Sequence, residues 1–76
     1  SGRMKRVILY VKEGCPRSRA ALAHYRRRGF AVQAIRVEAQ GRVLEEALKL
    51  AGNRRRLPIA VEGNRIKIGF RGFSRF

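Results

Sequence analysis

The apolar positions of the chain fall into short blocks, four of which have the pattern of strands. Residues 6–11 form a continuous apolar run rich in Val, Ile and Tyr, which is typical of a buried strand. Residues 30–37 alternate enough to form a second strand. Residues 59–62 and 65–68 flank a Gly-Asn pair, a signal for a two-residue hairpin turn, and they predict two short antiparallel strands.

Two other segments repeat their apolar residues with helical spacing. Residues 16–28 carry one apolar stripe, and Gly29 supplies a stop signal. Residues 41–51 carry another stripe, which Gly52 ends. The predicted order is β-α-β-α-β-β, an α/β fold. A right-handed parallel crossover followed by an antiparallel hairpin predicts a mixed four-stranded sheet with helices packed on it.

The length of the chain fits one small domain. We interpret residues 1–5 as an N-terminal extension and residues 6–76 as a single domain. The first two residues, Ser1-Gly2, resemble the remnant of a cleaved tag. No apolar stretch approaches the ~20 residues that span a bilayer, and no signal-peptide pattern is present. A single cysteine is typical of a protein in a reducing compartment, so we expect a cytoplasmic protein. We also expect it to be a monomer and to make no contact with a membrane.

The charge of the chain is strongly positive. Lys and Arg number 19 against five acidic residues, giving +14, and there is no aspartate. Three interpretations are open: a basic surface without a specific role, a site for a small anionic ligand, and nucleic-acid binding. Nucleic acid is the least favoured, because the aromatic residues form no paired platform on which bases would stack.

The only cysteine, Cys15, lies where the first strand meets the first helix. A helix start carries unsatisfied N–H groups and a partial positive charge, both of which favour a thiolate. Pro16 suits the first helical position. Lys12 and Arg17 add cations, and such surroundings lower a thiol pKa from about 8.5, often to between about 3.5 and 7.5. The pattern therefore predicts a nucleophilic sulfur.

Ser18 lies one helical turn beyond Cys15, where a two-cysteine redox motif would carry its second sulfur. Its hydroxyl can donate a hydrogen bond to the thiolate. Since it cannot form a disulfide, a mixed disulfide on Cys15 would have to be resolved by an outside thiol. The alternative is that Ser18 is a tolerated replacement without a chemical role.

Several short motifs, taken in order, resemble a glutaredoxin within the thioredoxin fold. They are Lys12-x-Gly14-Cys15-Pro16-x-x-Arg19, the helix end Ala51-Gly52, the loop Arg54-Arg55-Arg56-Leu57-Pro58 and the hairpin with Gly63. The resemblance covers nearly all of residues 6–73. Ser18 in place of a second cysteine is similar to monothiol glutaredoxins, but their usual motif is Cys-Gly-Phe-Ser, and this chain has Pro16 and Arg17 instead. The Cys-Pro-x-Ser form resembles a small bacterial branch that includes the type called UXX-star, whose members can carry selenocysteine at the cysteine position.

The resemblance implies a cis peptide bond before Pro58, facing Cys15, with the Leu57 backbone placed to pair with an extended thiol peptide. It also implies that Lys12 lies beside the thiolate and Arg56 near the carboxylate of a bound thiol peptide. The chain departs from the family at Gly69-Phe70-Arg71, where a Gly-Gly pair and an acid normally bind glutathione. This string is closer to small redoxins served by thioredoxin reductase. The final helix of the family is expected to be absent or vestigial.

These inferences predict a thiol–disulfide oxidoreductase with a monothiol mechanism. Glutathione or another small thiol is its expected cosubstrate, and disulfide-bearing or glutathionylated proteins are its expected partners. No tightly bound cofactor or metal is expected. One alternative is a [2Fe–2S] carrier formed as a glutathione-bridged dimer, and another is a redox-inactive module that binds acidic partners or nucleic acid. The predicted catalytic residues are Cys15 and Ser18, and the predicted substrate-binding residues are Lys12, Pro16, Arg17, Arg56, Leu57, Pro58, Gly69 and Phe70.

Overall fold

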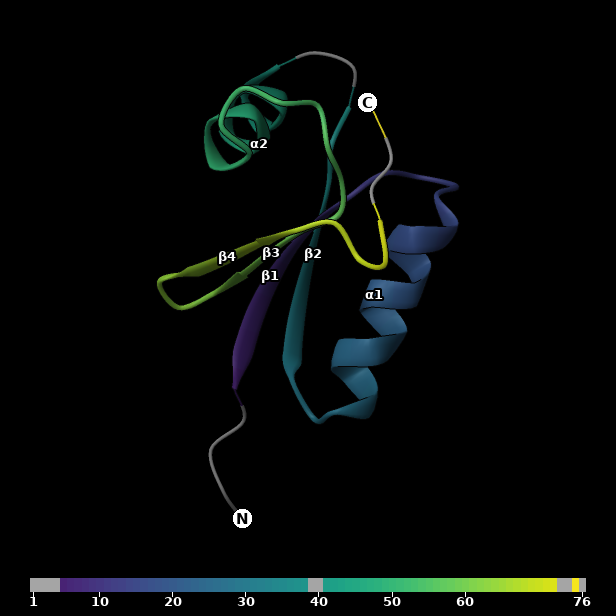
Figure 1. The fold of residues 1–76 in the computed structure, drawn as a ribbon. Helices are drawn as coiled ribbons and strands as arrows, with labels where there is room; N and C mark the ends of the chain where they lie inside the picture. The colour runs from purple at the N-terminus through teal and green to yellow at the C-terminus, as the bar shows by residue number, and fades with distance from the viewer. Residues whose placement is uncertain (1–4, 39–40, 73–74, 76) are drawn as a thin grey trace.

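A computed structural model describes residues 5–38, 41–72 and 75 of the chain. Its elements are β1 (Arg6–Val11), α1 (Pro16–Arg27), β2 (Ala31–Arg36), α2 (Arg42–Leu50), β3 (Ile59–Glu62) and β4 (Arg65–Ile68) (Figure 1). The bounds of β1, β3 and β4 are those predicted from the sequence. Compared with the prediction, α1 is one residue shorter at its C-terminal end, and β2 and α2 are each one residue shorter at both ends. Glycines with positive φ lie near these ends: Gly29 (82°) between α1 and β2, and Gly41 (112°) before α2.

The four strands form one mixed sheet in the order β2-β1-β3-β4. Strand β1 runs parallel to β2 and antiparallel to β3, and β3 pairs antiparallel with β4. The predicted α/β fold with a mixed four-stranded sheet is therefore confirmed. Residues 70–72, after β4, form bends. Residues 1–4 of the predicted extension lie outside the described residues. Residues 73, 74 and 76 lie outside them as well, so the structure does not test whether the final helix of the family is absent.

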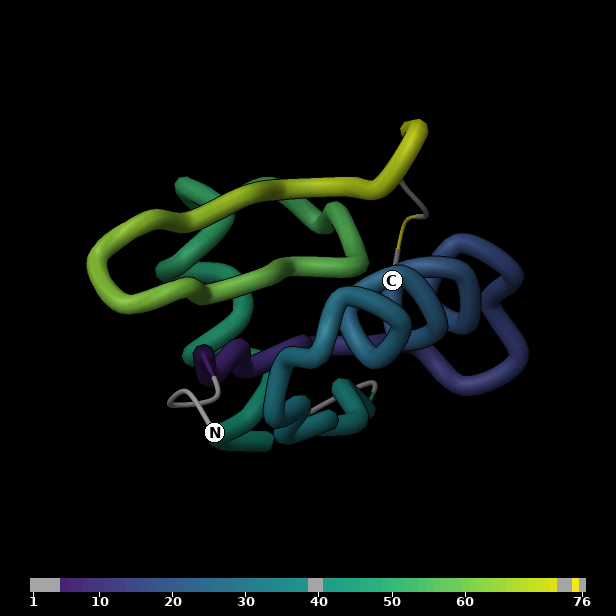
Figure 2. Tube along the Cα trace, turned by 90° about the horizontal axis from the view of Figure 1, so that it is seen from below, coloured from purple at the N-terminus to yellow at the C-terminus, as the bar shows by residue number. Residues whose placement is uncertain are grey.

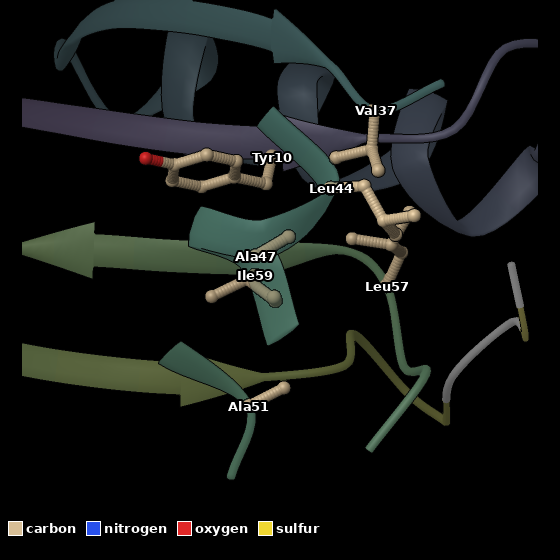
Figure 3. Close-up of a cluster of buried hydrophobic side chains, with 7 residues drawn as sticks. All are labelled: Tyr10, Val37, Leu44, Ala47, Ala51, Leu57 and Ile59. Carbon is tan, nitrogen blue, oxygen red and sulfur yellow. The ribbon is translucent and has the colours of Figure 1, made fainter. Parts of the chain in front are cut away.

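The two helices cover opposite faces of the sheet, as the two views together show (Figures 1 and 2). Because side chains alternate along a strand, β1 contributes to both faces. Val7, Leu9 and Val11 pack with Ala21 and Tyr25 of α1. The other face carries a second cluster, which includes α2 residues and the loop before β3 (Figure 3): Tyr10, Val37, Leu44, Ala47, Ala51, Leu57 and Ile59.

A polar network joins α1 to the hairpin of β3 and β4. The Tyr25 hydroxyl donates to Glu62 Oε2 at 3.0 Å, and Lys67 Nζ lies 3.1 Å from the same oxygen. Burial, together with the hydrogen bond to Glu62, raises the pKa of Tyr25 to about 12. Burial acts to raise the pKa of Glu62 as well, but hydrogen bonds from Lys67 and Tyr25 and the nearby positive charges outweigh it, so this pKa is lowered.

This network predicts a decline of stability in alkali. The pKa of Tyr25 is about 12 in the folded chain against an ordinary value of 10.0, so the folded state holds the phenolic proton more tightly. Its contribution is complete below pH 10 and is lost as the pH rises towards 12. We expect the difference in free energy of unfolding between the wild type and Tyr25→Phe to shrink across this window in urea titrations. A difference that is constant with pH would contradict the prediction.

Candidate functional site

The turn between β1 and α1 places Cys15 at the helix start. Cys15 N–H donates to the Lys12 carbonyl at 3.2 Å, closing a turn in which Gly14 has a φ of 75°. This is a region of φ that glycine occupies without strain. Cys15 has extended backbone geometry at the N-cap of α1, and its carbonyl accepts from Arg19 N–H at 3.1 Å. The residue is only 5% exposed, which the sequence pattern did not indicate.

Ser18 has a structural contact that sequence reasoning missed. Its side chain is almost fully buried, and its Oγ accepts a hydrogen bond from Lys12 N–H at 3.1 Å. The bond ties the first turn of α1 to the start of the turn that leads to Cys15. Because a hydroxyl can accept and donate at the same time, donation from Ser18 to a Cys15 thiolate stays a prediction.

Removing this hydroxyl is expected to destabilise the fold. In Ser18→Ala the Lys12 N–H loses its acceptor in a part-buried hydrogen bond, which costs roughly 1 kcal/mol. The free energy of unfolding from urea titrations measures the loss. Arg19→Ala, an exposed change at the next position, serves as the control and should stay within about 0.5 kcal/mol of the wild type. Equal effects in the two variants would refute the structural role of Ser18.

The loop before β3 brings Pro58 together with the segment after β4. The Leu57–Pro58 peptide bond is cis, as the resemblance implies. Gly69 N–H donates to the Pro58 carbonyl at 2.7 Å, so these two predicted binding residues are neighbours. Phe70 follows, half-buried against the α1 face of the sheet, with its ring 5.2 Å from that of His24. Phe70 therefore contributes to packing in addition to its predicted binding role.

Arg17, in the first turn of α1, lies against the same C-terminal segment. A Cβ placed on Gly72 would meet Arg17 Nε at 2.8 Å, so the guanidinium group occupies the space that the missing side chain leaves. Gly72 has a φ of 117°, which side-chain-bearing residues rarely adopt. The two contacts, Pro58 with Gly69 and Arg17 with Gly72, hold the segment after β4 between the Pro58 loop and the N-terminus of α1.

An arginine-rich loop joins α2 to Leu57. Asn53 N–H donates to the Leu48 carbonyl at 2.7 Å, and Arg54 N–H donates to the Ala51 carbonyl at 3.3 Å. These bonds satisfy carbonyl groups at the C-terminus of α2, where the helix dipole also favours cations. Backbone hydrogen bonds therefore tie the start of the loop to the end of α2.

This loop forms one wall of an open cavity of about 620 Å³. The lining residues are Asn53, Arg54, Arg55, Arg56 and Arg75. Lys12 Nζ donates to the Arg75 carbonyl at 2.9 Å, so the Lys12 side chain links the turn that carries Cys15 to a residue of the cavity lining. Sequence reasoning predicted a binding role for Arg56 and none for Arg54 or Arg55. It missed Arg75, which no local pattern distinguishes from the other arginines of the chain.

Within the part of the chain that the structure describes, no group of three or more His, Cys, Asp or Glu side chains is arranged to hold a metal ion. Among the same residues, neither helix has the length and apolar character needed to cross a bilayer.

Comparison with known proteins identifies the fold. No protein-family model matches the chain, and no curated protein matches its sequence. Its structure is similar to the crystal structure of a glutaredoxin from Archaeoglobus fulgidus, with a TM-score of 0.71 and 22% sequence identity. The match covers 88% of this chain and 77% of that one. The chain therefore has a glutaredoxin-like thioredoxin fold.

Proposed function

We propose that this protein is a glutaredoxin-like thiol–disulfide oxidoreductase that acts by a monothiol mechanism. The observation that carries the proposal is the place of Cys15. The only cysteine of the chain lies at the start of α1, in a turn tied down by Ser18. Lys12 of that turn donates to the carbonyl of Arg75, which lines the arginine-rich cavity. The fold of the solved glutaredoxin supports the same activity class.

The mechanism has two exchange steps. The Cys15 thiolate attacks one sulfur of a mixed disulfide, a new S–S bond forms to Cys15, and the other sulfur leaves as a thiolate that takes a proton from water. A second thiolate, from glutathione or another small thiol, then attacks the bond to Cys15. This releases a small disulfide and restores the Cys15 thiolate. The outside thiol is required because Ser18 offers no second sulfur.

We assign substrate binding to the residues that the sequence predicts for it. Lys12 and Arg56 attract the carboxylates of the thiol, and the Leu57 backbone pairs with its extended peptide. Pro16 fixes the helix start. Arg17, Pro58, Gly69 and Phe70 form the rest of the surface that a disulfide meets. We further propose a cytoplasmic setting, where small thiols are reduced, and the similarity to the UXX-star type stays a prediction.

Adduct formation tests the proposal directly. The reduced protein is mixed with a glutathione mixed disulfide, and the intact mass is followed with time. We expect one glutathione adduct, mapped to Cys15 by peptide analysis, which an excess of reduced glutathione or a second small thiol then removes. If the protein reacts with the mixed disulfide no faster than a free low-molecular-weight thiol does, the proposed activity is contradicted.

A further inference from the structure

The cavity that Lys12 links to the Cys15 turn has a high concentration of positive charge. Four of its five lining residues are arginines, and the fifth is Asn53, so the described lining includes no carboxylate. Arg54, Arg55 and Arg75 are exposed, and Arg56 is half-buried, so their side chains are accessible to a ligand. A volume of about 620 Å³ falls within the roughly 300–1,000 Å³ typical of sites for whole small ligands.

The chemistry of these side chains favours a ligand with several negative charges. A guanidinium group is planar and always charged, and it matches phosphate and carboxylate oxygens in a bidentate manner. Since it has five N–H donors, an arginine with a partner inside the protein can still donate to an anion. One carboxylate is matched by one guanidinium, whereas four guanidinium groups in one cavity suit a phosphate or pyrophosphate.

Glutathione is a poor match for the cavity as a whole. It carries a free ammonium group in addition to its carboxylates, and an ammonium group finds no carboxylate among the described residues of the lining. The described charged residues of the segment from Lys67 to Gly72 are cations as well, namely Lys67 and Arg71. Both features favour a substrate whose end away from the sulfur is purely anionic.

On the basis of the proposed function, we propose that the preferred substrate of Cys15 is a disulfide of a small thiol that bears a phosphate or pyrophosphate group. The phosphate binds in the cavity formed by Asn53, Arg54, Arg55, Arg56 and Arg75. The bond from Lys12 Nζ to the Arg75 carbonyl joins this cavity to the Cys15 turn. The Cys15 thiolate forms a bond to one sulfur of the bound disulfide, and the other half leaves as a thiolate.

Anion binding tests the cavity without any redox step. The protein with Cys15→Ser is titrated with inorganic pyrophosphate and with acetate by calorimetry at fixed ionic strength. We expect pyrophosphate to bind at least tenfold more tightly than acetate. A further Arg54→Ala or Arg75→Ala change should weaken pyrophosphate binding at least fivefold. Arg27→Ala, on the last turn of α1, removes the same charge outside the cavity and should change binding less than twofold. Equal losses in all three variants, or no preference over acetate, would overturn the proposal.

Matched disulfides test the substrate preference. The wild type is assayed with the disulfides of phosphopantetheine and of pantetheine, which differ only in the phosphate, and with a glutathione mixed disulfide. We expect kcat/KM for the phosphorylated disulfide to exceed that for the other two at least tenfold. In Arg54→Ala this preference should fall towards unity, whereas Arg27→Ala should keep it. Equal rates with all three disulfides would overturn the proposed substrate class.

The two experiments separate this proposal from the proposed function. If the protein exchanges all three disulfides at equal rates, it is an oxidoreductase, and only the substrate class is wrong. If it exchanges none of them, the oxidoreductase assignment fails. The calorimetric comparison of Arg54→Ala with Arg27→Ala then still decides whether the cavity is a phosphate site.

Discussion

Replacing Cys15 by serine is expected to reduce disulfide exchange to the rate of the uncatalysed reaction. The chain has one cysteine, so no other side chain can form the mixed disulfide on which the mechanism depends. A serine hydroxyl is not ionised at neutral pH and does not attack sulfur, whereas thiol–disulfide exchange requires a thiolate. The measurement is the rate of reduction of a glutathione mixed disulfide with glutathione present in excess.

The control for this variant is Ala23→Ser, which adds the same residue type to an exposed position of α1. It should keep the wild-type rate and the wild-type stability. Cys15 is nearly buried, so Cys15→Ser must also be shown to be folded, by circular dichroism and by its urea midpoint. A folded Cys15→Ser protein that retains more than a tenth of the wild-type rate would refute the proposed mechanism.

The sequence predicted the fold well because each element has a strong local signal. The apolar run of β1 and the Gly63-Asn64 turn between β3 and β4 are both short-range patterns, and the structure confirms the bounds that they predicted. The helix starts and stops were also near their predicted places, since Pro16 and the glycines fix backbone geometry locally. The resemblance to the glutaredoxin family then added the cis bond before Pro58, which local patterns alone do not indicate.

The site was predicted less completely, because its contacts join residues far apart in the chain. The bond from Lys12 Nζ to the Arg75 carbonyl spans 63 positions, and nothing in the sequence around Arg75 indicates it. The acceptor role of Ser18 was missed for a different reason. The sequence placed its hydroxyl near Cys15 by helical spacing, but the direction of the hydrogen bond to Lys12 depends on how the turn folds back on α1.

The candidate site is formed by the loops that connect the sheet to its two helices and by the segment after β4. The α1 face and the α2 face of the sheet each hold one core cluster. The candidate site residues come from the loops that join these elements. The turn before α1 contributes Cys15, and the loop after α2 contributes Arg56 and Pro58. The segment after β4 bonds to Pro58 through Gly69 and lies against Arg17 through Gly72. Packing of the loop after α2 should therefore affect both stability and activity.

Leu57→Ala is expected to be the most destabilising of the substitutions considered for this loop. The Leu57 side chain is fully buried and lies beside Leu44 in the cluster under α2 (Figure 3). Truncating a buried leucine costs about 2–5 kcal/mol, because apolar burial is lost and a cavity is left. At roughly 0.05–0.15 kcal/mol per residue, a domain of this size has only about 4–11 kcal/mol of stability. Leu57→Ala should therefore lower the urea midpoint severely.

Two further variants make the prediction for Leu57 specific. Ile66→Ala, on β4, removes an apolar side chain that is 47% exposed and should cost less than about 1 kcal/mol. Leu57→Met keeps the volume and should cost less than about 1.5 kcal/mol. The buried Leu57 lies between Arg56 and Pro58, two predicted binding residues. Leu57→Ala should therefore also slow disulfide exchange when it is assayed under conditions in which the protein is still folded. Leu57→Met should keep most of the wild-type rate. If Leu57→Ala and Ile66→Ala shifted the urea midpoint equally, the core would not hold this loop in place.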